Sequence, residues 1–170
     1  MGQITFRAME RGDIERILAA EYANYTSNKT IKNLEKLYDD QERGLRTVII
    51  AERDGELIGR VTLLHSSSSS IFKYKNIPEV MGLTVIEKYQ RQGIGTELMN
   101  RIEAAASELS DTVCLNVALC ETAGAAQILF AKRGYIPDGS GLWYGRQVAH
   151  KAGTINDVGS LTLCVWKKLR

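Results

Sequence analysis

The sequence lacks a strong excess of charge of either sign, and it lacks long apolar runs. Its 22 Lys and Arg residues against 20 Asp and Glu residues leave a net charge of +2 over 170 residues. No basic stripe with interleaved aromatic side chains is present, which argues against binding to nucleic acid. No apolar run reaches the roughly 20 residues of a membrane span, and the N-terminal stretch MGQITFRAMERGD lacks the apolar core of a secretory signal. We therefore expect a cytoplasmic protein that binds neither nucleic acid nor membrane.

Cysteine and histidine are scarce as well. The 3 cysteines, Cys114, Cys120 and Cys164, form no C-x-x-C pair, and their odd number argues against a disulfide framework. Cys114 and Cys164 lie within apolar, strand-like runs, where cysteine is usually a small buried hydrophobic residue. His65 and His150 are far apart in sequence and have no cysteine or carboxylate at ligand spacing. We expect no metal site.

The length and the balanced composition indicate one globular domain. A chain of 170 residues with 44% hydrophobic and 25% charged residues can form one substantial core, so we assign residues 1–170 to a single domain. The sequence shows no internal repeat. Its one low-complexity tract, Ser66–Ser70, is typical of a solvated loop between strands, since serine hydroxyls compete for backbone hydrogen bonds. A mobile flap beside an acceptor site is the alternative.

Hydrophobic periodicity predicts strands that alternate with helices. A hairpin is expected around Asp54-Gly55, since this dipeptide suits a tight turn. The Gly-rich stretch Asp138–Ser160 is expected to carry a small hairpin. The predicted order is β-α-α-β-β-β-α-β-α-β, which favours one mixed sheet with helices on both faces. The helical segments are ERGDIERILAAEYANYT, TIKNLEKLYDD, Gly93 to about Leu109, and AGAAQILFAKR. In the third of these, Ile94, Leu98, Ile102 and Ala106 stand four residues apart, which predicts one apolar face.

The stretch Tyr89–Thr96, YQRQGIGT, joins a strand-like run to a helix-like run. A helix start leaves four N–H groups without intrahelical partners and carries a partial positive charge. Gly93 and Gly95 remove side chains that would keep an anion from these amides, and Arg91 adds charge. The pattern predicts a phosphate-binding turn, and a glycine-relieved turn without a ligand is the alternative. The Gly-Lys-Ser/Thr of a P-loop is missing.

QRQGIG fits the Q/R-x-x-G-x-G/A motif of the GNAT superfamily of N-acetyltransferases, which binds the pyrophosphate of acetyl-CoA. LTVIEKYQRQGIGTELMNRIE resembles the strand–loop–helix unit of that family, and AAQILFAKRGY resembles its later helix. The order of elements is also similar from Ile4 to Leu169. The resemblance implies a GNAT-like α/β (α+β) fold with a mixed, mostly antiparallel central sheet and helices on both faces. It also implies a parallel, splayed strand pair at the cofactor site, formed by Glu79–Val85 and Val113–Leu119.

The same resemblance implies the residues that bind acetyl-CoA. Leu83 and Val85 would offer backbone groups to the pantetheine arm, and Phe130 stands where the family often has a tyrosine that acts as general acid. Since a phenyl ring cannot donate a proton, we expect Phe130 to pack against the cofactor instead. The pyrophosphate would be received at the turn by Arg91, Gln92, Gly93, Ile94, Gly95 and Thr96.

Glu79 is the candidate general base. An amine acceptor resembling lysine has a pKa of about 10.4, so the nucleophile must lose a proton before or during attack. Glu79 is similar in position to the glutamate that the histone-acetylating branch uses as its base, and an apolar strand around it would partly desolvate it. The alternatives are a solvated glutamate at the start of a strand, or a water path to another base.

The sequence therefore predicts an acetyl-CoA-dependent N-acetyltransferase that acts by direct attack of a primary amine of a small molecule or protein. A non-catalytic acyl-CoA-binding or sensing domain of the same fold is the main alternative, and an interaction protein without a ligand is another. We expect the acceptor pocket to come from the first two helices, the serine tract and Gly141–Gly159. The sequence leaves the acceptor unidentified and a homodimer open.

Overall fold

The computed structural model describes residues 2–22, 27–67, 72, 75–144, 147–149 and 160–170. They form two compact units, which are described one at a time. The first unit comprises Met1–Leu64 and Met81–Ala105, and the second comprises His65–Val80 and Ala106–Arg170. The assignment of residues 1–170 to one domain stays a prediction.

Eight strands are hydrogen-bonded in the order β1-β2-β3-β4-β5-β8-β6-β7. The pair β4–β5 is parallel, and the other pairs with a described register are antiparallel. The predicted mixed, mostly antiparallel sheet is thus confirmed. The strands are β1 (Ile4–Ala8), β2 (Arg46–Arg53), β3 (Glu56–Leu64), β4 (Glu79–Val85), β5 (Thr112–Ala118), β6 (Ile136–Tyr144), β7 (Gln147–Val148) and β8 (Leu161–Lys168).

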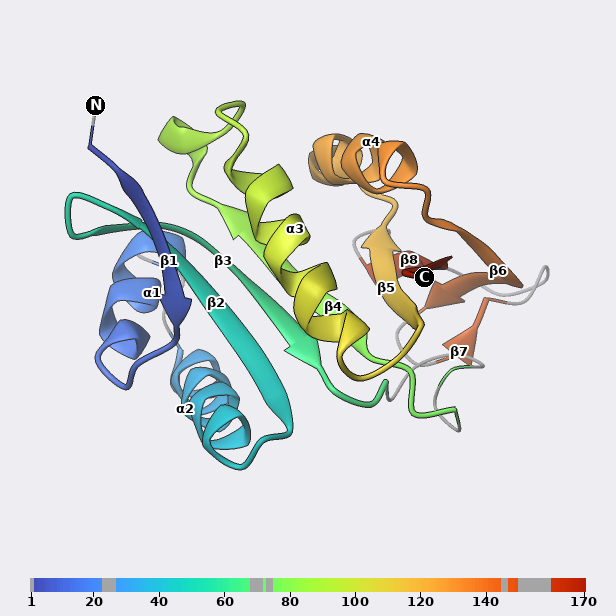
Figure 1. Ribbon diagram of the computed structural model, residues 1–170, viewed down its shortest axis with the longest axis horizontal. Helices are drawn as coiled ribbons and strands as arrows, with labels where there is room; N and C mark the ends of the chain where they lie inside the picture. The colour runs from blue at the N-terminus through green and yellow to red at the C-terminus, as the bar shows by residue number, and fades with distance from the viewer. Residues whose placement is uncertain (1, 23–26, 68–71, 73–74, 145–146, 150–159) are drawn as a thin grey trace. The chain divides into compact units, whose positions relative to one another are not determined.

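In the first unit, β2 and β3 form the predicted hairpin around Asp54 and Gly55, and β1 pairs with the free side of β2 (Figure 1). Val48 and Ile50 of β2 point to the face that α1 (Asp13–Glu21) and α2 (Asn28–Glu42) cover. They pack there with Ile17 of α1 and Leu34 of α2, and all four side chains are buried. This apolar cluster is the core on one side of the sheet.

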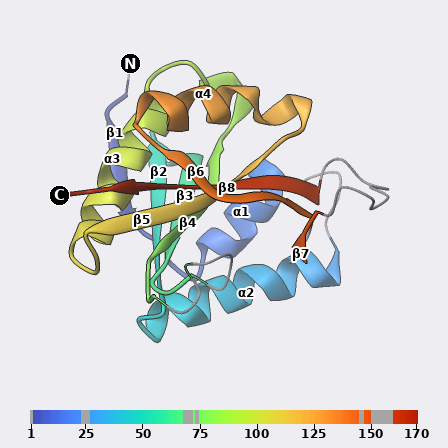
Figure 2. The same cartoon turned by 90° about the vertical axis from the view of Figure 1, so that its right-hand side faces the viewer.

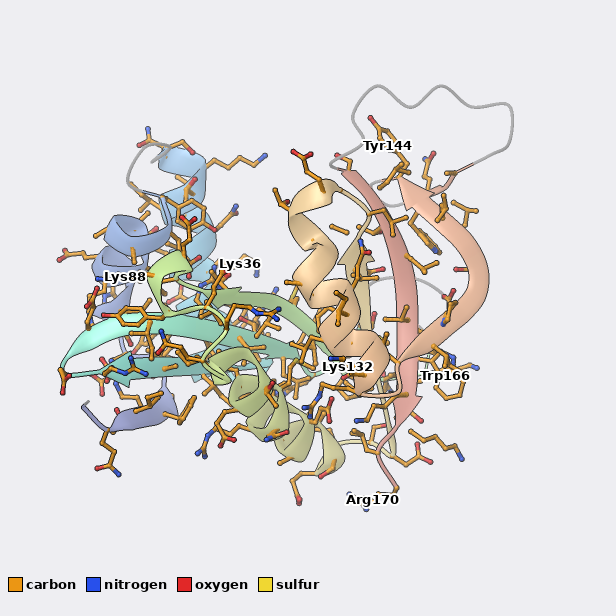
Figure 3. The ribbon with its side chains drawn as sticks, turned by 90° about the horizontal axis from the view of Figure 1, so that it is seen from above. Lys36, Lys88, Lys132, Tyr144, Trp166 and Arg170 are labelled. Carbon is orange, nitrogen blue, oxygen red and sulfur yellow. The ribbon has the colours of Figure 1, made fainter. Side chains whose placement is uncertain are left out.

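Helix α3 (Ile94–Ser107) covers the opposite face, so helices lie on both faces of the first unit's strands. Figure 3 shows the blue helices α1 and α2 on one side of the teal strands and the yellow-green helix α3 on the other. Gly59 of β3 lets α3 and β4 lie close to β3. A Cβ at this position would lie 3.3 Å from Leu98 Cδ1 of α3 and 2.7 Å from the carbonyl oxygen of Thr84 of β4. The predicted apolar face of this helix is confirmed, since Ile94, Leu98 and Ile102 are buried.

A network of ion pairs ties β1 and β2 to the start of α1. The buried carboxylate of Asp13 accepts hydrogen bonds from Arg7 Nη1 at 2.6 Å and from Arg16 Nη1 at 2.7 Å. Glu52 accepts from Arg7 Nε at 2.9 Å. Burial alone would raise the pKa of Asp13, but the Arg7 hydrogen bond and the backbone N–H of Glu10 hold the pKa of this carboxyl below its usual range. The contribution of Asp13 to this network is therefore present only while its carboxyl is ionised.

In the second unit, β5, β8 and β6 run side by side, and α4 (Gly124–Lys132) lies along one side of them (Figure 2). Cys114 and Cys164 are buried beside Phe72 and Ile77, as their places in apolar runs predict. The hairpin expected in the Gly-rich stretch is formed by β6 and β7. Residues 68–70 of the serine tract and 150–159 of the Gly-rich stretch lie outside the described residues.

Candidate functional site

The turn before α3 has two residues in the left-handed backbone region. Arg91 and Gly93 adopt positive φ angles of 62° and 83°. The first α-helical hydrogen bond runs from the Glu97 N–H to the Gly93 carbonyl at 3.0 Å, so the N–H groups of the three residues between them precede the intrahelical ladder. Arg91 and Gly93 are exposed, and a Cβ built on Gly93 would meet nothing within 4 Å. The turn therefore combines an exposed cation, an exposed glycine and N–H groups that the helix itself does not pair.

The loop that leads into this turn is held by several side chains. The hydroxyl of Tyr89 donates to Glu56 at 2.5 Å, and Arg53 stacks over the Tyr89 ring at 5.3 Å from its centroid. Arg53 also donates to Gln92 Oε1 at 3.0 Å. Because these contacts come from β2, β3 and the turn itself, they fix the shape of the turn before any anion binds. Gln92 is thus a bonding partner of Arg53 as well as a candidate ligand residue.

The predicted backbone partners of the pantetheine arm lie on β4, just before this loop. Leu83 and Val85 are half-buried. The carbonyl oxygen of Val85 accepts a hydrogen bond from Gln90 Nε2 at 3.0 Å, which leaves it one further lone pair. Ile94 is buried in the core through its side chain, so only its backbone N–H is suited to a ligand, whereas Thr96 is exposed.

Glu79 belongs to the second unit and is not the solvated glutamate of the alternative interpretation. Its side chain is only 4% exposed. Its Oε2 accepts from the hydroxyl of Ser67 at 2.6 Å, and its Oε1 accepts from Asn116 Nδ2 at 2.8 Å. Two donors thus fix the carboxylate, and each oxygen keeps a lone pair for a further proton donor. Burial, and the neighbouring charge of Glu79, also raise the pKa of the Cys114 thiol.

The parallel pairing of β4 with β5 places Glu79 opposite Cys114 and Val80 opposite Leu115, and the described ladder comprises these two pairs. Asn116 lies two residues farther along β5, on the same face as Cys114 by strand alternation. The pairing of β4 with β5 therefore positions Glu79 at the start of β4. Asn116 of β5 then supplies the amide that donates to its carboxylate.

Phe130 lies on α4 in the second unit and is 8% exposed. Its ring packs edge-on against Tyr135, with centroids 5.8 Å apart and planes at 64°. This contact shows Phe130 as a packing residue within its own unit. Its contact with a cofactor stays a prediction.

Sequence reasoning missed the two partners of Glu79. Ser67 stood within a tract that composition assigns to solvent, yet this residue is 2% exposed. Asn116 carried a usable signal, because it is the one polar residue within the apolar run VCLNVAL. A half-buried amide on a core strand calls for a hydrogen-bonding partner, and Glu79 is that partner.

Two further expectations concern what the chain does not bind. Within the described ranges, no three His, Cys, Asp or Glu side chains gather closely enough to hold a metal ion. His150 lies outside those ranges. None of the helices that the structure describes has the length and apolar character of a membrane span.

Comparison with known proteins gives one family and several similar folds. The family model described as "Acetyltransferase (GNAT) family" matches residues 13–135. An uncharacterized N-acetyltransferase of Archaeoglobus fulgidus is 33% identical over 81 residues, which are 48% of this chain and 52% of that protein. The chain thus matches about half the length of this curated relative.

Two solved structures illustrate the similarity of fold. The crystal structure of an N-acetyltransferase from Staphylococcus aureus Mu50 has a TM-score of 0.73 at 18% identity, with 99% of each chain covered. The spermidine/spermine N-acetyltransferase of Vibrio cholerae, solved in complex with manganese ions, has a TM-score of 0.67 at 20% identity, covering 98% of this chain and 93% of that one. At such identities the likeness is one of fold alone.

Proposed function

The chain belongs to the GNAT family of acetyltransferases, and from this premise we propose that it transfers the acetyl group of acetyl-CoA to a primary amine of a small molecule or protein. The observation that carries the proposal is the turn before α3. There, Arg91 and Gly93 have positive φ angles, a Cβ on Gly93 would meet nothing within 4 Å, and the N–H groups of residues 94–96 precede the first intrahelical hydrogen bond. The cytoplasmic location expected from the sequence is part of the same proposal.

The turn fits the pyrophosphate of acetyl-CoA. An anion at a helix N-terminus accepts hydrogen bonds from free N–H groups and is stabilised by the helix dipole. A side chain at Gly93 would occupy the space that now lies open above the turn, and Arg91 adds a cation. Backbone groups of Leu83 and Val85 would hold the pantetheine arm as an added strand. When bound, the co-substrate supplies an acetyl thioester.

Glu79 is the group we assign to take the proton of the amine. Its two hydrogen-bond donors, Ser67 and Asn116, hold the carboxylate in one orientation. Because Glu79 is 4% exposed, the proton reaches it through a bound water or through the Ser67 hydroxyl rather than from bulk solvent. This combines the two options that the sequence left open, a positioned base and a water path.

The chemistry is a direct attack. The amine nitrogen forms the new amide bond while the thioester C–S bond breaks, and the proton that the nitrogen loses passes to Glu79. The thiolate leaves with the bonding electron pair. Because a thiol has a pKa of about 8.5, it leaves readily without a general acid. Phe130 at the family's acid position is compatible with this, since no proton donor is required there.

A non-catalytic acyl-CoA-binding or sensing domain is the second candidate, and the absence of a hydroxyl at Phe130 favours it. One experiment separates the two. Calorimetry with CoA measures binding, and chromatographic detection of acetylated product measures transfer to a panel of amines, amino acids and peptides. Binding with transfer supports the enzyme, binding without transfer supports the sensor, and no binding of CoA refutes both.

A further inference from the structure

A pocket of about 420 Å³ lies in the first unit, between α2 and the face of the sheet that α1 and α2 cover. It is enclosed by the end of α1, by α2, and by β2, β3 and β4. Apolar side chains form part of its wall. The residues of its lining that carry polar side-chain groups are Tyr22, Thr30, Asn33, Lys36, Arg46, Arg60 and Thr62.

The pocket lining is cationic. It contains three basic side chains, and no carboxylate belongs to it among the described residues. Asp40, which is buried, accepts from Lys36 Nζ at 3.0 Å and from Arg46 Nε at 2.9 Å, and Arg43 Nη1 lies 3.9 Å from it, so one carboxylate faces three cations. Lys36 is labelled in Figure 3. Arg46 Nη1 donates to the thioether sulfur of Met81, a weak acceptor, at 3.2 Å. Arg46 Nη1 is therefore available to donate to a stronger acceptor, such as an oxyanion.

Two polar residues lie where the sheet face would otherwise be apolar. Arg60 and Thr62 of β3 stand opposite Ile50 and Val48 of β2, which belong to the core under α1 and α2. Arg60 is held by Glu21 through two hydrogen bonds of 2.7 and 2.8 Å. Thr62 is 1% exposed, and its hydroxyl finds no hydrogen-bond partner in the part of the chain that the structure describes. An unpaired buried hydroxyl is unfavourable for folding, which points to a ligand as its partner.

Gly82 of β4 has no side chain to occupy the space next to Arg60 and Thr62. Its φ angle is +60°, and a Cβ at this position would lie 3.3 Å from Arg60 Nη1 and 3.9 Å from Thr62 Oγ1. A side chain would fill the space that a ligand atom needs to reach them. Gly82 directly precedes Leu83, the predicted backbone partner of the pantetheine arm. An acceptor in this pocket therefore lies beside the strand that would hold the thioester.

We propose that this pocket binds an oxyanion of the acceptor, so that the substrate is an amine that also carries a carboxylate or a phosphate. The inference rests on the proposed function. Arg46 and the Thr62 hydroxyl would donate to the oxyanion, and Lys36 and Arg60 would add favourable charge. The same charges repel a polyamine, which has ammonium groups and no anion.

The test uses pairs of amines that differ in the anionic group alone. L-lysine is compared with cadaverine, L-phenylalanine with phenethylamine, and O-phosphoethanolamine with ethanolamine, and spermidine is included as a polyamine. For each amine, kcat/KM is measured by product chromatography with saturating acetyl-CoA. We expect the anionic member of at least one pair to be preferred by 10-fold or more. The carboxylate and phosphate pairs separate the two sources of the oxyanion.

Three variants connect that preference to the pocket. Arg46→Met should reduce kcat/KM for the preferred anionic amine by about 10- to 100-fold, the scale of a charged hydrogen bond, and Arg46→Lys should restore part of it. Arg43→Met is the matched control, because Arg43 also lies within 3.9 Å of Asp40 but does not line the pocket. Thr62→Val should raise KM about 2- to 10-fold without lowering Tm, whereas a merely structural hydroxyl would leave KM unchanged.

The outcomes separate this inference from the proposed function. Acetylation of cadaverine or spermidine as efficient as that of every anionic amine would overturn the oxyanion pocket and leave the acetyltransferase standing. If CoA binds and no amine is acetylated, the proposed transfer fails. Calorimetry with the same amines then decides the pocket. Binding of an anionic member that weakens in Arg46→Met supports it, and equal or absent binding within every pair overturns it.

Discussion

Replacing Glu79 with glutamine isolates the charge of the candidate base from its shape. The present carboxylate accepts from Asn116 Nδ2 at 2.8 Å and from Ser67 Oγ at 2.6 Å. In Glu79→Gln the amide oxygen can keep the bond from Asn116. The new NH2 group can donate to the Ser67 oxygen once that hydroxyl turns away. Both contacts thus survive with neutral partners.

The expected cost in stability is small, because two effects oppose each other. Two charge-assisted hydrogen bonds become neutral, which costs about 1 kcal/mol, while the penalty of burying a charge in a site that is 4% exposed disappears. We expect the free energy of unfolding to change by no more than about 2 kcal/mol. This corresponds to a Tm shift of about 2–4 °C per kcal/mol for a chain of this size.

Turnover should fall far more than stability. Loss of a positioned proton acceptor lowers kcat by roughly 10²–10⁴-fold. The deficit should shrink as pH rises toward about 10, because an amine with a pKa of about 10.4 is then partly neutral without help. CoA affinity should be retained, since the turn before α3 is untouched.

The assay is product formation from an identified acceptor at pH 7 to 10, with CoA affinity measured by calorimetry. Glu103→Gln is a suitable control, because Glu103 is a second buried glutamate, 8% exposed, on α3. Near-normal turnover of folded Glu79→Gln at pH 7 would remove Glu79 from the mechanism. A loss of similar size in Glu103→Gln would show that the effect is one of folding.

Three further predictions follow from the described contacts. Gly93→Ala and Gly134→Ala should lower Tm alike, because both glycines have φ near +85° and open space at Cβ, but only the first should weaken CoA binding; equal affinities would refute the anion site. A thiol reagent at pH 8 should modify Cys120, whose pKa is lowered by a hydrogen bond with a threonine hydroxyl, before the buried Cys114, as peptide mass spectrometry would show or contradict. The pKa of Asp13 is lower in the folded than in the unfolded chain, so its contribution to stability is present above about pH 4 and is lost as pH falls through the folded value. Urea unfolding of Asp13→Asn should accordingly depend less on pH below about 4 than that of the parent protein, and equal dependence would contradict this.

The sequence was sufficient for the fold because local signals and global packing agree. Asp54-Gly55 predicted the β2–β3 hairpin, and the four-residue spacing of Ile94, Leu98 and Ile102 predicted the buried face of α3. Gly93 and Gly95 predicted a turn before α3, and Gly93 has a positive φ there. Each of these features depends on residues that are close in sequence, which is why periodicity and turn chemistry could find it.

The surroundings of the site could not be read in this way, because they depend on pairings between distant segments. Asn116 reaches Glu79 only through the register of β4 with β5. Arg60 and Thr62 alternate with apolar residues, a pattern typical of a solvent-facing strand side, yet α1 and α2 cover that side and both residues are buried. Ser67 is buried although its neighbours in sequence are serines. Composition and alternation describe the average exposure of a residue type. Arg60, Thr62 and Ser67 depart from that average because distant segments cover them.

The two faces of β3 lead to separate roles for the segments that cover them. The proposed oxyanion pocket takes its cations from α2, β2 and the α1-facing side of β3, whereas the proposed phosphate-binding turn belongs to the loop and helix on the other side. We therefore expect substitutions in α2 to alter the choice of acceptor without changing the binding of acetyl-CoA. In evolutionary terms, a duplicated copy of this chain could acquire a new substrate by drift in one helix. For the same reason, a library restricted to exposed and pocket-lining positions of Asn28–Glu42 is the most economical route to retargeting it.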